Sequence, residues 1–193
     1  MRKGTHNLML VLLGMFSIIG LVSCTSDGTV TPTPTPTPTP APAPSPATAP
    51  GWMDIELTDV ATGQTFKVSD FKGKPILLES FTVWCPTCLA QQKEVKKVKQ
   101  IEGENIIHIS LDTDPNEDED KVREHIEKNE LDWYFAVSPV ELTQALIDEF
   151  GLNFVSAPRA PVVLICEEQS TRFLRSGMKS AEELISEIQK GCE

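Results

Sequence analysis

The chain has 193 residues, with 17 basic and 28 acidic side chains and a formal net charge of −11. This length accommodates one domain with additional segments, and the negative charge argues against binding to nucleic acid or to anionic lipid surfaces. The chain also has five cysteines. They are spread along the sequence, so each needs its own explanation.

The N-terminal segment has the pattern of a secretory signal. Arg2 and Lys3 precede a mostly apolar stretch, 8–22, which is too short to span a bilayer comfortably. It ends in Leu21-Val22-Ser23-Cys24, which resembles a lipoprotein signal. The resemblance implies a signal peptide over 1–23, lipidation of Cys24, and a lipid-anchored protein on the extracytoplasmic face of the cell membrane. The alternatives are an uncleaved anchor and a plain secretory signal, which also place the domain outside the cytoplasm.

Residues 24–51 are predicted to form a Thr/Pro-rich linker. Consecutive Thr-Pro units fill 31–40 and are followed by Ala-Pro and Ser-Pro units. Because proline fixes φ and biases the preceding residue toward extended backbone, we expect polyproline II geometry, at about 3.1 Å per residue. The segment can be interpreted as a stalk or as a spacer of no special length. Both interpretations predict that the folded domain occupies 52–193.

Strands and helices are predicted to alternate through this domain. A β-hairpin is expected first, with strands over 55–58 and 65–68. The strands and helices then expected in chain order are strand 76–83, helix 86–101, strand 105–111, helix 116–130, strand 133–137, helix 141–150, a hairpin of 162–166 and 171–175, and a last helix after Ser180. This order predicts an α/β sheet covered by helices on both faces.

Apolar spacing predicts which side of each helix faces the core. The inward positions expected are Leu89, Val95, Val98 and Ile101 in the first helix, Val122 and Ile126 in the second, and Leu184, Ile185 and Ile188 in the last. Ser180, with Glu183 three residues later, predicts a capping box at the start of the last helix.

The segment Trp84-Cys85-Pro86-Thr87-Cys88 is the most informative part of the sequence. It follows a predicted buried strand and opens a predicted helix. Unpaired N–H groups and the positive end of the dipole favour thiolate at a helix N-terminus, where a cysteine pKa can fall from ~8.5 to roughly 3.5–7.5. The second cysteine lies one turn later on the same face, within reach of a disulfide. The pattern predicts a redox-active pair.

The two cysteines have three other interpretations. A structural zinc site needs two further ligands, and the remaining cysteines and histidines show no paired spacing. A peroxidase is suggested by Thr82, three residues before Cys85, but Leu78 stands where a peroxiredoxin has proline. A protein that holds Cu(I) without catalysis is the third. We favour the redox pair and expect neither a cofactor nor a metal.

The order of elements resembles the thioredoxin fold, and more closely the extracytoplasmic TlpA/ResA/CcmG-like thiol–disulfide oxidoreductases. The resemblance covers about 52–191. It rests on the segment 64–75, the Trp-Cys-Pro-Thr-Cys motif, the extra helix and strand of 116–137, a proline before the strand 162–166, and the final hairpin and helix. It implies a thioredoxin-like mixed sheet flanked by helices, with an N-terminal β-hairpin and a central helix–strand insert.

The resemblance also implies a mechanism and partners. Cys85 would attack a substrate disulfide, and the more buried Cys88 would resolve the mixed disulfide. Pro86 suits the first turn of a helix because it lacks an N–H, Thr87 adds a hydroxyl, and Trp84 would shield the sulfurs. The expected reaction is reduction of protein disulfides, with electrons supplied by a membrane thiol protein.

Two further residues are given roles by the resemblance. Glu79 is expected to accept the proton of the second thiol, and strand alternation with Leu77 and Phe81 favours its burial. Pro161 is the candidate for the cis-proline beside the motif, with Pro158 as its rival. The backbone of the residue before Pro161 would then pair with an extended substrate segment.

The remaining cysteines are predicted to form a structural disulfide. In the implied topology the last helix runs parallel to the strand that ends at Cys166, so Cys192 comes to the same side of the sheet. That side is opposite the motif. Two buried free thiols are the alternative.

Acidic residues crowd the segment 112–120. The segment lacks the glycine and the final glutamate of a calcium-binding EF-hand loop. We expect a solvated acidic surface that caps a helix.

Overall fold

The computed structural model describes residues 50–192. The predicted signal peptide 1–23, the lipidation site Cys24 and nearly all of the linker 24–51 lie outside the described residues. Within the described part, no helix has the length and apolar character needed to cross a membrane.

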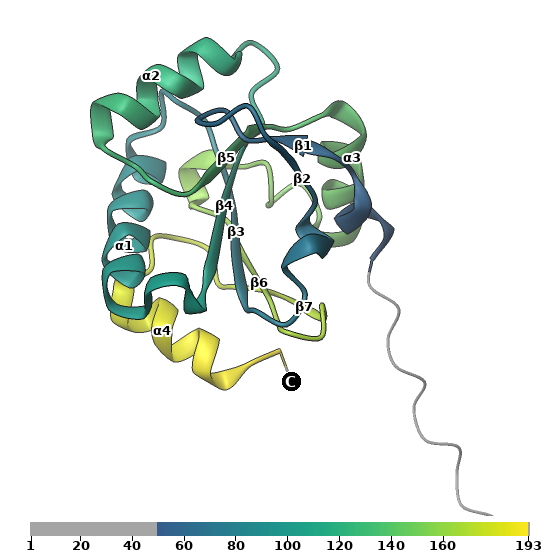
Figure 1. Cartoon of the computed structure of the whole chain (residues 1–193), viewed down its shortest axis with the longest axis vertical. Coiled ribbons are helices and arrows are strands. Elements are labelled where there is room, and N and C mark those ends of the chain that lie inside the picture. The colour runs from purple at the N-terminus through teal and green to yellow at the C-terminus, as the bar shows by residue number, and fades with distance from the viewer. Residues whose placement is uncertain (1–49, 193) are drawn as a thin grey trace, which may run out of the picture. The chain divides into compact units, whose positions relative to one another are not determined.

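A five-stranded mixed sheet forms the centre of the domain (Figure 1). The strand order is β5-β4-β3-β6-β7. The strands are β3 (Ile76–Phe81), β4 (Ile107–Asp112), β5 (Tyr134–Val137), β6 (Val162–Ile165) and β7 (Thr171–Phe173). The first three are parallel, since helices connect them, whereas β6 runs antiparallel to both β3 and β7. This arrangement confirms the predicted thioredoxin-like α/β sheet.

The predicted N-terminal hairpin is present as a separate two-stranded sheet, β1 (Leu57–Thr58) and β2 (Thr65–Phe66). Asp59 organises its turn, because the Asp59 carboxylate accepts hydrogen bonds from the Thr62 hydroxyl at 2.6 Å and from the Thr62 N–H. The other Asp59 oxygen accepts from the backbone N–H of Phe135 at 3.2 Å. The hairpin is therefore attached to β5. Short 3-10 helices flank it, η1 (Gly51–Asp54) and η2 (Val68–Phe71).

Helices cover both faces of the sheet. The helices are α1 (Pro86–Glu102), α2 (Glu119–Asn129), α3 (Val140–Phe150) and α4 (Ala181–Lys190), with short 3-10 helices η3 (Gly103–Asn105) and η4 (Ala157–Arg159). One apolar cluster joins the sheet to α1, α2 and α4, and a second joins the other face to α3 and η1. Figure 1 shows α1 and α4 together on one side of the sheet and α3 on the other. The active-site motif starts α1.

The inward face of α1 differs from the prediction. Val95 and Val98 are buried as expected, but Ile101 is 63% exposed. Ile101 lies in the last turn of α1, where the chain leaves the helix through η3. The buried face of α1 instead extends from Val95 back toward the motif. It includes Gln91 and Gln92, which follow Cys88 by three and four residues and therefore lie on the same side of the helix. The prediction that Ile101 contributes to the core was wrong.

The start of α4 forms half of the predicted capping box. The Ser180 hydroxyl accepts a hydrogen bond from the backbone N–H of Glu183 at 3.3 Å, as an N-cap does. The Glu183 carboxylate, however, accepts from the guanidinium of Arg175, with an Nε–O distance of 2.6 Å. An ion pair with the preceding loop has replaced the reciprocal bond to the cap.

Candidate active site

Cys85 and Cys88 are joined by a disulfide at the N-terminus of α1. Their Cα atoms are 5.3 Å apart, within the range of ordinary disulfides. Cys85 is the N-cap residue, and its Sγ accepts a hydrogen bond from the backbone N–H of Cys88 at 3.1 Å. Pro86 is the first helical residue and leaves no orphan N–H there. A thiolate on Cys85 would receive the same hydrogen bond and the favourable end of the helix dipole.

Both sulfurs are well shielded. Cys85 and Cys88 are each 2% exposed, so the expectation that Cys88 would be the more buried of the two is not met. Trp84, beside them, is 61% exposed, and its indole N–H donates to the carboxylate of Asp114 at 2.8 Å. Trp84 and Asp114 line a surface cavity of about 250 Å³ together with Pro158. The cavity joins the motif to the turn before β6 at the surface.

The turn before β6 contacts the disulfide at Cys88. The Sγ of Cys88 lies 3.1 Å from the carbonyl oxygen of Ala157, to which a Cys88 thiol would donate. Pro161 is buried directly before β6, and its carbonyl oxygen accepts from the N–H of Ser80 at 3.4 Å. Pro158 lies in η4 and is exposed. Both proline candidates thus belong to the same turn, but only Pro161 is built into the sheet.

Ala160, between them, does not have the predicted geometry. Its backbone is left-handed, with φ of 44° and ψ of 60°, and the residue is 2% exposed. Its N–H donates to Ala157 at 2.9 Å, and its carbonyl accepts from Lys179 at 2.9 Å. Because both peptide groups are satisfied inside the protein, Ala160 cannot offer them to a substrate strand. The predicted pairing at this residue is corrected accordingly.

Glu79 lies in the middle of β3 and is buried, as strand alternation predicted. Its carboxylate accepts a hydrogen bond from the Ser110 hydroxyl at 2.6 Å, and the Trp133 indole N–H donates to that hydroxyl at 2.9 Å. Burial raises the pKa of Glu79 to about 7, although Ser110, Gln92 and the charge of Lys179 act in the opposite direction. A carboxyl group with this pKa exchanges protons readily near neutral pH.

Two residues of the acidic run 112–120, which was predicted to be solvated and helix-capping, lie near the motif instead. Asp112 ends β4 and is 1% exposed, and burial raises its pKa to about 7. Glu117 accepts a hydrogen bond from the backbone N–H of Val83 at 2.7 Å, so it fixes the segment that leads from β3 into the motif. Only part of the run 112–120 is the solvated, helix-capping surface expected, with Asp118 as the N-cap of α2.

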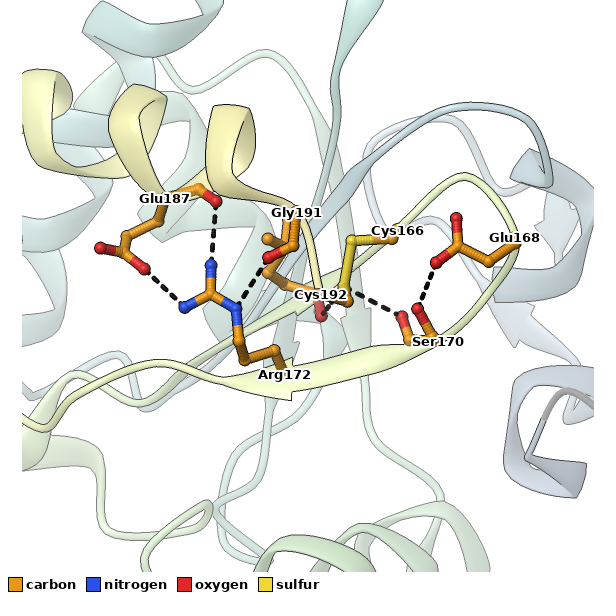
Figure 2. Close-up of a disulfide and its surroundings, with 8 residues drawn as sticks. Cys166, Glu168, Ser170, Arg172, Glu187, Gly191 and Cys192 are labelled. Atoms are coloured by element: carbon orange, nitrogen blue, oxygen red, sulfur yellow. Dashed lines mark hydrogen bonds and ion pairs between the residues drawn. A yellow bond between two sulfur atoms is a disulfide. The ribbon is translucent and has the colours of Figure 1, made fainter. Parts of the chain in front are cut away.

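Cys166 and Cys192 are joined by a second disulfide at the other end of the sheet (Figure 2). Ile165, next to Cys166, pairs with Ile76 at the start of β3, whereas the motif follows the end of β3. Arg172 supports the same corner, donating to the Gly191 carbonyl at 2.8 Å and to the Glu187 carboxylate at 2.5 Å. The C-terminal segment is thereby attached to β6 and β7, far from the redox pair.

The described residues contain no cluster of side chains that could bind a metal ion. Among residues 50–192, no group of three or more His, Cys, Asp or Glu side chains is placed to hold an ion. His108 is buried against Trp133, and burial lowers its pKa to about 4. His125 is bound to the Gln92 amide at 2.7 Å. The disulfide, with Glu79 on the sheet face that α1 covers, is thus the chemically distinctive site.

Solved structures with the same fold are known from several bacteria. A thiol:disulfide interchange protein of the thioredoxin family from Chlorobium tepidum is 17% identical, with 79% of this chain and 100% of that chain covered and a TM-score of 0.62. A secreted Mycobacterium tuberculosis disulfide oxidoreductase, described as homologous to Escherichia coli DsbE, is 17% identical, covers 74% and 99%, and has a TM-score of 0.59. A SCO1/SenC family lipoprotein from Bacillus anthracis is also 17% identical, covers 72% and 93%, and has a TM-score of 0.57.

Comparisons of sequence show which family the chain belongs to. An uncharacterised Haemophilus influenzae protein is 29% identical over 98 residues, which are 51% of this chain and 58% of that protein. The aligned segment thus spans less than two thirds of that relative. The redoxin family matches residues 40–170, which include the motif, Glu79 and Pro161. On this match, and with a thioredoxin-like sheet that places two cysteines at a helix N-terminus, the chain belongs to the redoxin family.

Proposed function

We propose that this protein is a thiol–disulfide oxidoreductase that reduces disulfides in other proteins through Cys85 and Cys88. The observation that carries the proposal is the Cys85–Cys88 disulfide at the N-terminus of α1, above a sheet face that holds a buried carboxyl group with a pKa of about 7. A structural disulfide does not require an ionisable group at this place. A dithiol that must lose a proton during each cycle does.

The reaction follows from these positions. In the reduced protein the Cys85 thiolate attacks one sulfur of the substrate disulfide, and the other substrate sulfur leaves as a thiolate. Glu79 accepts the proton of the Cys88 thiol. The Cys88 thiolate then attacks the Cys85 sulfur, which closes the Cys85–Cys88 disulfide and releases the second substrate sulfur. Two electrons have passed to the substrate, and an external thiol protein must reduce the pair again.

The cellular setting belongs to the same proposal. The lipoprotein-like sequence at Leu21-Val22-Ser23-Cys24 supports cleavage, lipidation of Cys24 and attachment to the outer face of the cell membrane. The second disulfide supports an oxidising compartment, since structural disulfides persist there and are rare in the cytosol. A membrane thiol protein is then the natural electron donor, and the segment 24–51 would separate the domain from the lipid.

Trapping tests the proposed reaction. Full-length protein with Cys88→Ser should accumulate a mixed disulfide with its protein substrates, because the step that releases them is lost. A variant with Cys166→Ala and Cys192→Ala is the matched control, and it should exchange disulfides at the wild-type rate. The reduction potential of the Cys85–Cys88 pair, measured on the same proteins, decides the direction of electron flow.

Three results would contradict the proposal. Turnover that depends on peroxide, without reduction of protein disulfides, would assign the protein as a thiol peroxidase. Tight Cu(I) binding by the reduced pair, with negligible disulfide exchange, would assign it as a copper-holding protein. A reduction potential near −120 mV, typical of strong oxidants, would reverse the direction proposed here.

A further inference from the structure

A fully buried lysine lies behind the turn that contacts the active-site disulfide. Lys179 belongs to the loop between β7 and α4, and its side chain is 0% exposed. Burying a lysine is costly unless its charge is satisfied, because the ammonium group loses its hydration. The sequence gives no sign of this position, since a lysine in a short Gly-Met-Lys-Ser segment is typical of a surface loop.

The Lys179 ammonium group is satisfied by three backbone oxygens. Its Nζ donates to the carbonyls of Gly177 at 2.6 Å, Ala160 at 2.9 Å and Arg175 at 3.0 Å. An ammonium group has three N–H donors, and a neutral amine has two. Three acceptors therefore match the charged form. They also mean that an apolar side chain here would leave buried carbonyl groups without a donor.

The same residue connects α1 to the turn before Pro161. The backbone N–H of Lys179 donates to the Gln91 amide oxygen at 2.8 Å, and the Gln91 amide group donates to the Lys179 carbonyl at 3.2 Å. Gln91 is fully buried in α1, three residues after Cys88. The turn is held a second time by the N–H of Gly177, which donates to Arg159 at 2.7 Å.

These contacts hold a strained residue in place. Ala160 has a positive φ, which costs a residue with a β-carbon roughly 1–2 kcal/mol. Its carbonyl is bound by Lys179, and its N–H is bound to the same Ala157 carbonyl that lies 3.1 Å from the Cys88 sulfur. The path from the ammonium group to the resolving cysteine therefore consists of consecutive short contacts through one turn.

Lys179 also acts on Glu79 by charge. Each group favours the charged form of the other: Lys179 lowers the pKa of Glu79, and Glu79 raises that of Lys179. The other charged groups that act on Lys179 are Arg175, which lowers its pKa, and Glu183, which raises it; burial is the largest influence and brings the Lys179 pKa to about 8. The other groups that act on Glu79 are uncharged, namely Ser110 from β4 and Gln92 from α1.

We propose that Lys179 is a positioning residue for the dithiol reaction, which holds the turn 157–161 against Cys88 and whose charge favours the ionised carboxylate of Glu79. The inference rests on the proposed function, and it adds a residue outside the motif that influences the pH range of the reaction. With Lys179 in place, Glu79 is ionised at lower pH and accepts the Cys88 proton over a wider range.

The test compares pH profiles of full-length variants. Lys179→Met removes the charge and all three donors, and Lys179→Gln, which keeps two donors without the charge, serves if the first variant folds poorly. Lys97→Met is the matched control, since Lys97 is exposed on α1 and pairs with Glu94. The rate of reduction of a disulfide-bridged reporter peptide is measured from pH 5 to pH 9.

We expect both Lys179 variants to move the midpoint of the profile upward, because Lys179 lowers the pKa of Glu79, so that the rate falls most below the midpoint and little at pH 9. The control should keep the wild-type midpoint. In a Glu79→Gln background, Lys179→Met should not move the profile. A purely structural lysine would lower stability in both backgrounds without this shift. A midpoint within about 0.3 units of wild type in both variants would overturn the proposal.

Two measurements keep this test separate from that of the function. The Glu79 carboxyl group is titrated directly by carbon NMR in reduced wild-type and variant proteins, and its pKa should rise when Lys179 is replaced. Hydrogen exchange of the Ala160 amide should accelerate at least about tenfold in Lys179→Met, while the Leu174 amide, bound to Val162, serves as the reference. If the wild type reduces no disulfide, the function fails, and these two results alone decide the role of Lys179.

Discussion

Removing the second disulfide should destabilise the domain without affecting its redox reaction. The pair Cys166–Cys192 closes a segment with a sequence separation of 26 residues. In the chain-entropy description, a loop of this length restricts the unfolded chain by about 3.5 kcal/mol at 25 °C. Replacing both cysteines by alanine should lower the free energy of unfolding by about 2–4 kcal/mol. The contacts of Arg172 with Glu187 and Gly191 remain in the variant and keep α4 in place.

The assay is urea unfolding followed by fluorescence and by circular dichroism, on oxidised wild type and on the double alanine variant. Exchange activity is measured on the same samples. It should stay within about twofold of wild type, because six residues of β3 separate the two disulfides by roughly 20 Å. A loss of stability below about 1 kcal/mol would refute the reasoning from loop closure. A loss of activity with stability intact would show that the two disulfides are coupled.

Three further predictions concern buried and strained residues. Because the folded pKa of Glu79 is raised to about 7 from 4.5, the folded state binds its proton more tightly, and the stability of the wild type should fall as pH rises from 4.5 to 7. Glu79→Gln should remove this part of the decline, seen in urea midpoints across that range; identical slopes would contradict it. Ile101→Lys should change the free energy of unfolding by less than about 0.5 kcal/mol, whereas Val98→Ala should lower it by about 2 kcal/mol. Equal losses of stability in thermal melts would show that Ile101 contributes to the core. Ala160→Gly should leave stability unchanged or raise it by up to about 1 kcal/mol, since glycine tolerates positive φ, and a clear loss would argue against the left-handed geometry.

The chemistry of the motif is local, and the sequence alone was sufficient to identify it. An apolar run followed by Cys85, Pro86 and Cys88 predicts the end of a strand and the start of a helix, because proline is tolerated in the first turn and the thiol spacing matches one helical turn. The alternation that placed Glu79 inward is equally local. For the same reason the order of strands and helices was predictable, although their ends shifted by a few residues, as at the start of α2.

Long-range packing decided the rest. Ile101 looked like a core residue, yet the helix passes out of reach of the core at its last turn, and two glutamines take the inward positions near the motif. The predicted substrate contact of Ala160 is wrong because its N–H and its carbonyl group are both hydrogen-bonded within the fold. Lys179 became part of the site only because the loop before α4 returns to the turn before β6. Local patterns determine which chemistry a segment can perform, but a buried charge depends on partners distant in sequence, and only the tertiary structure brings those together.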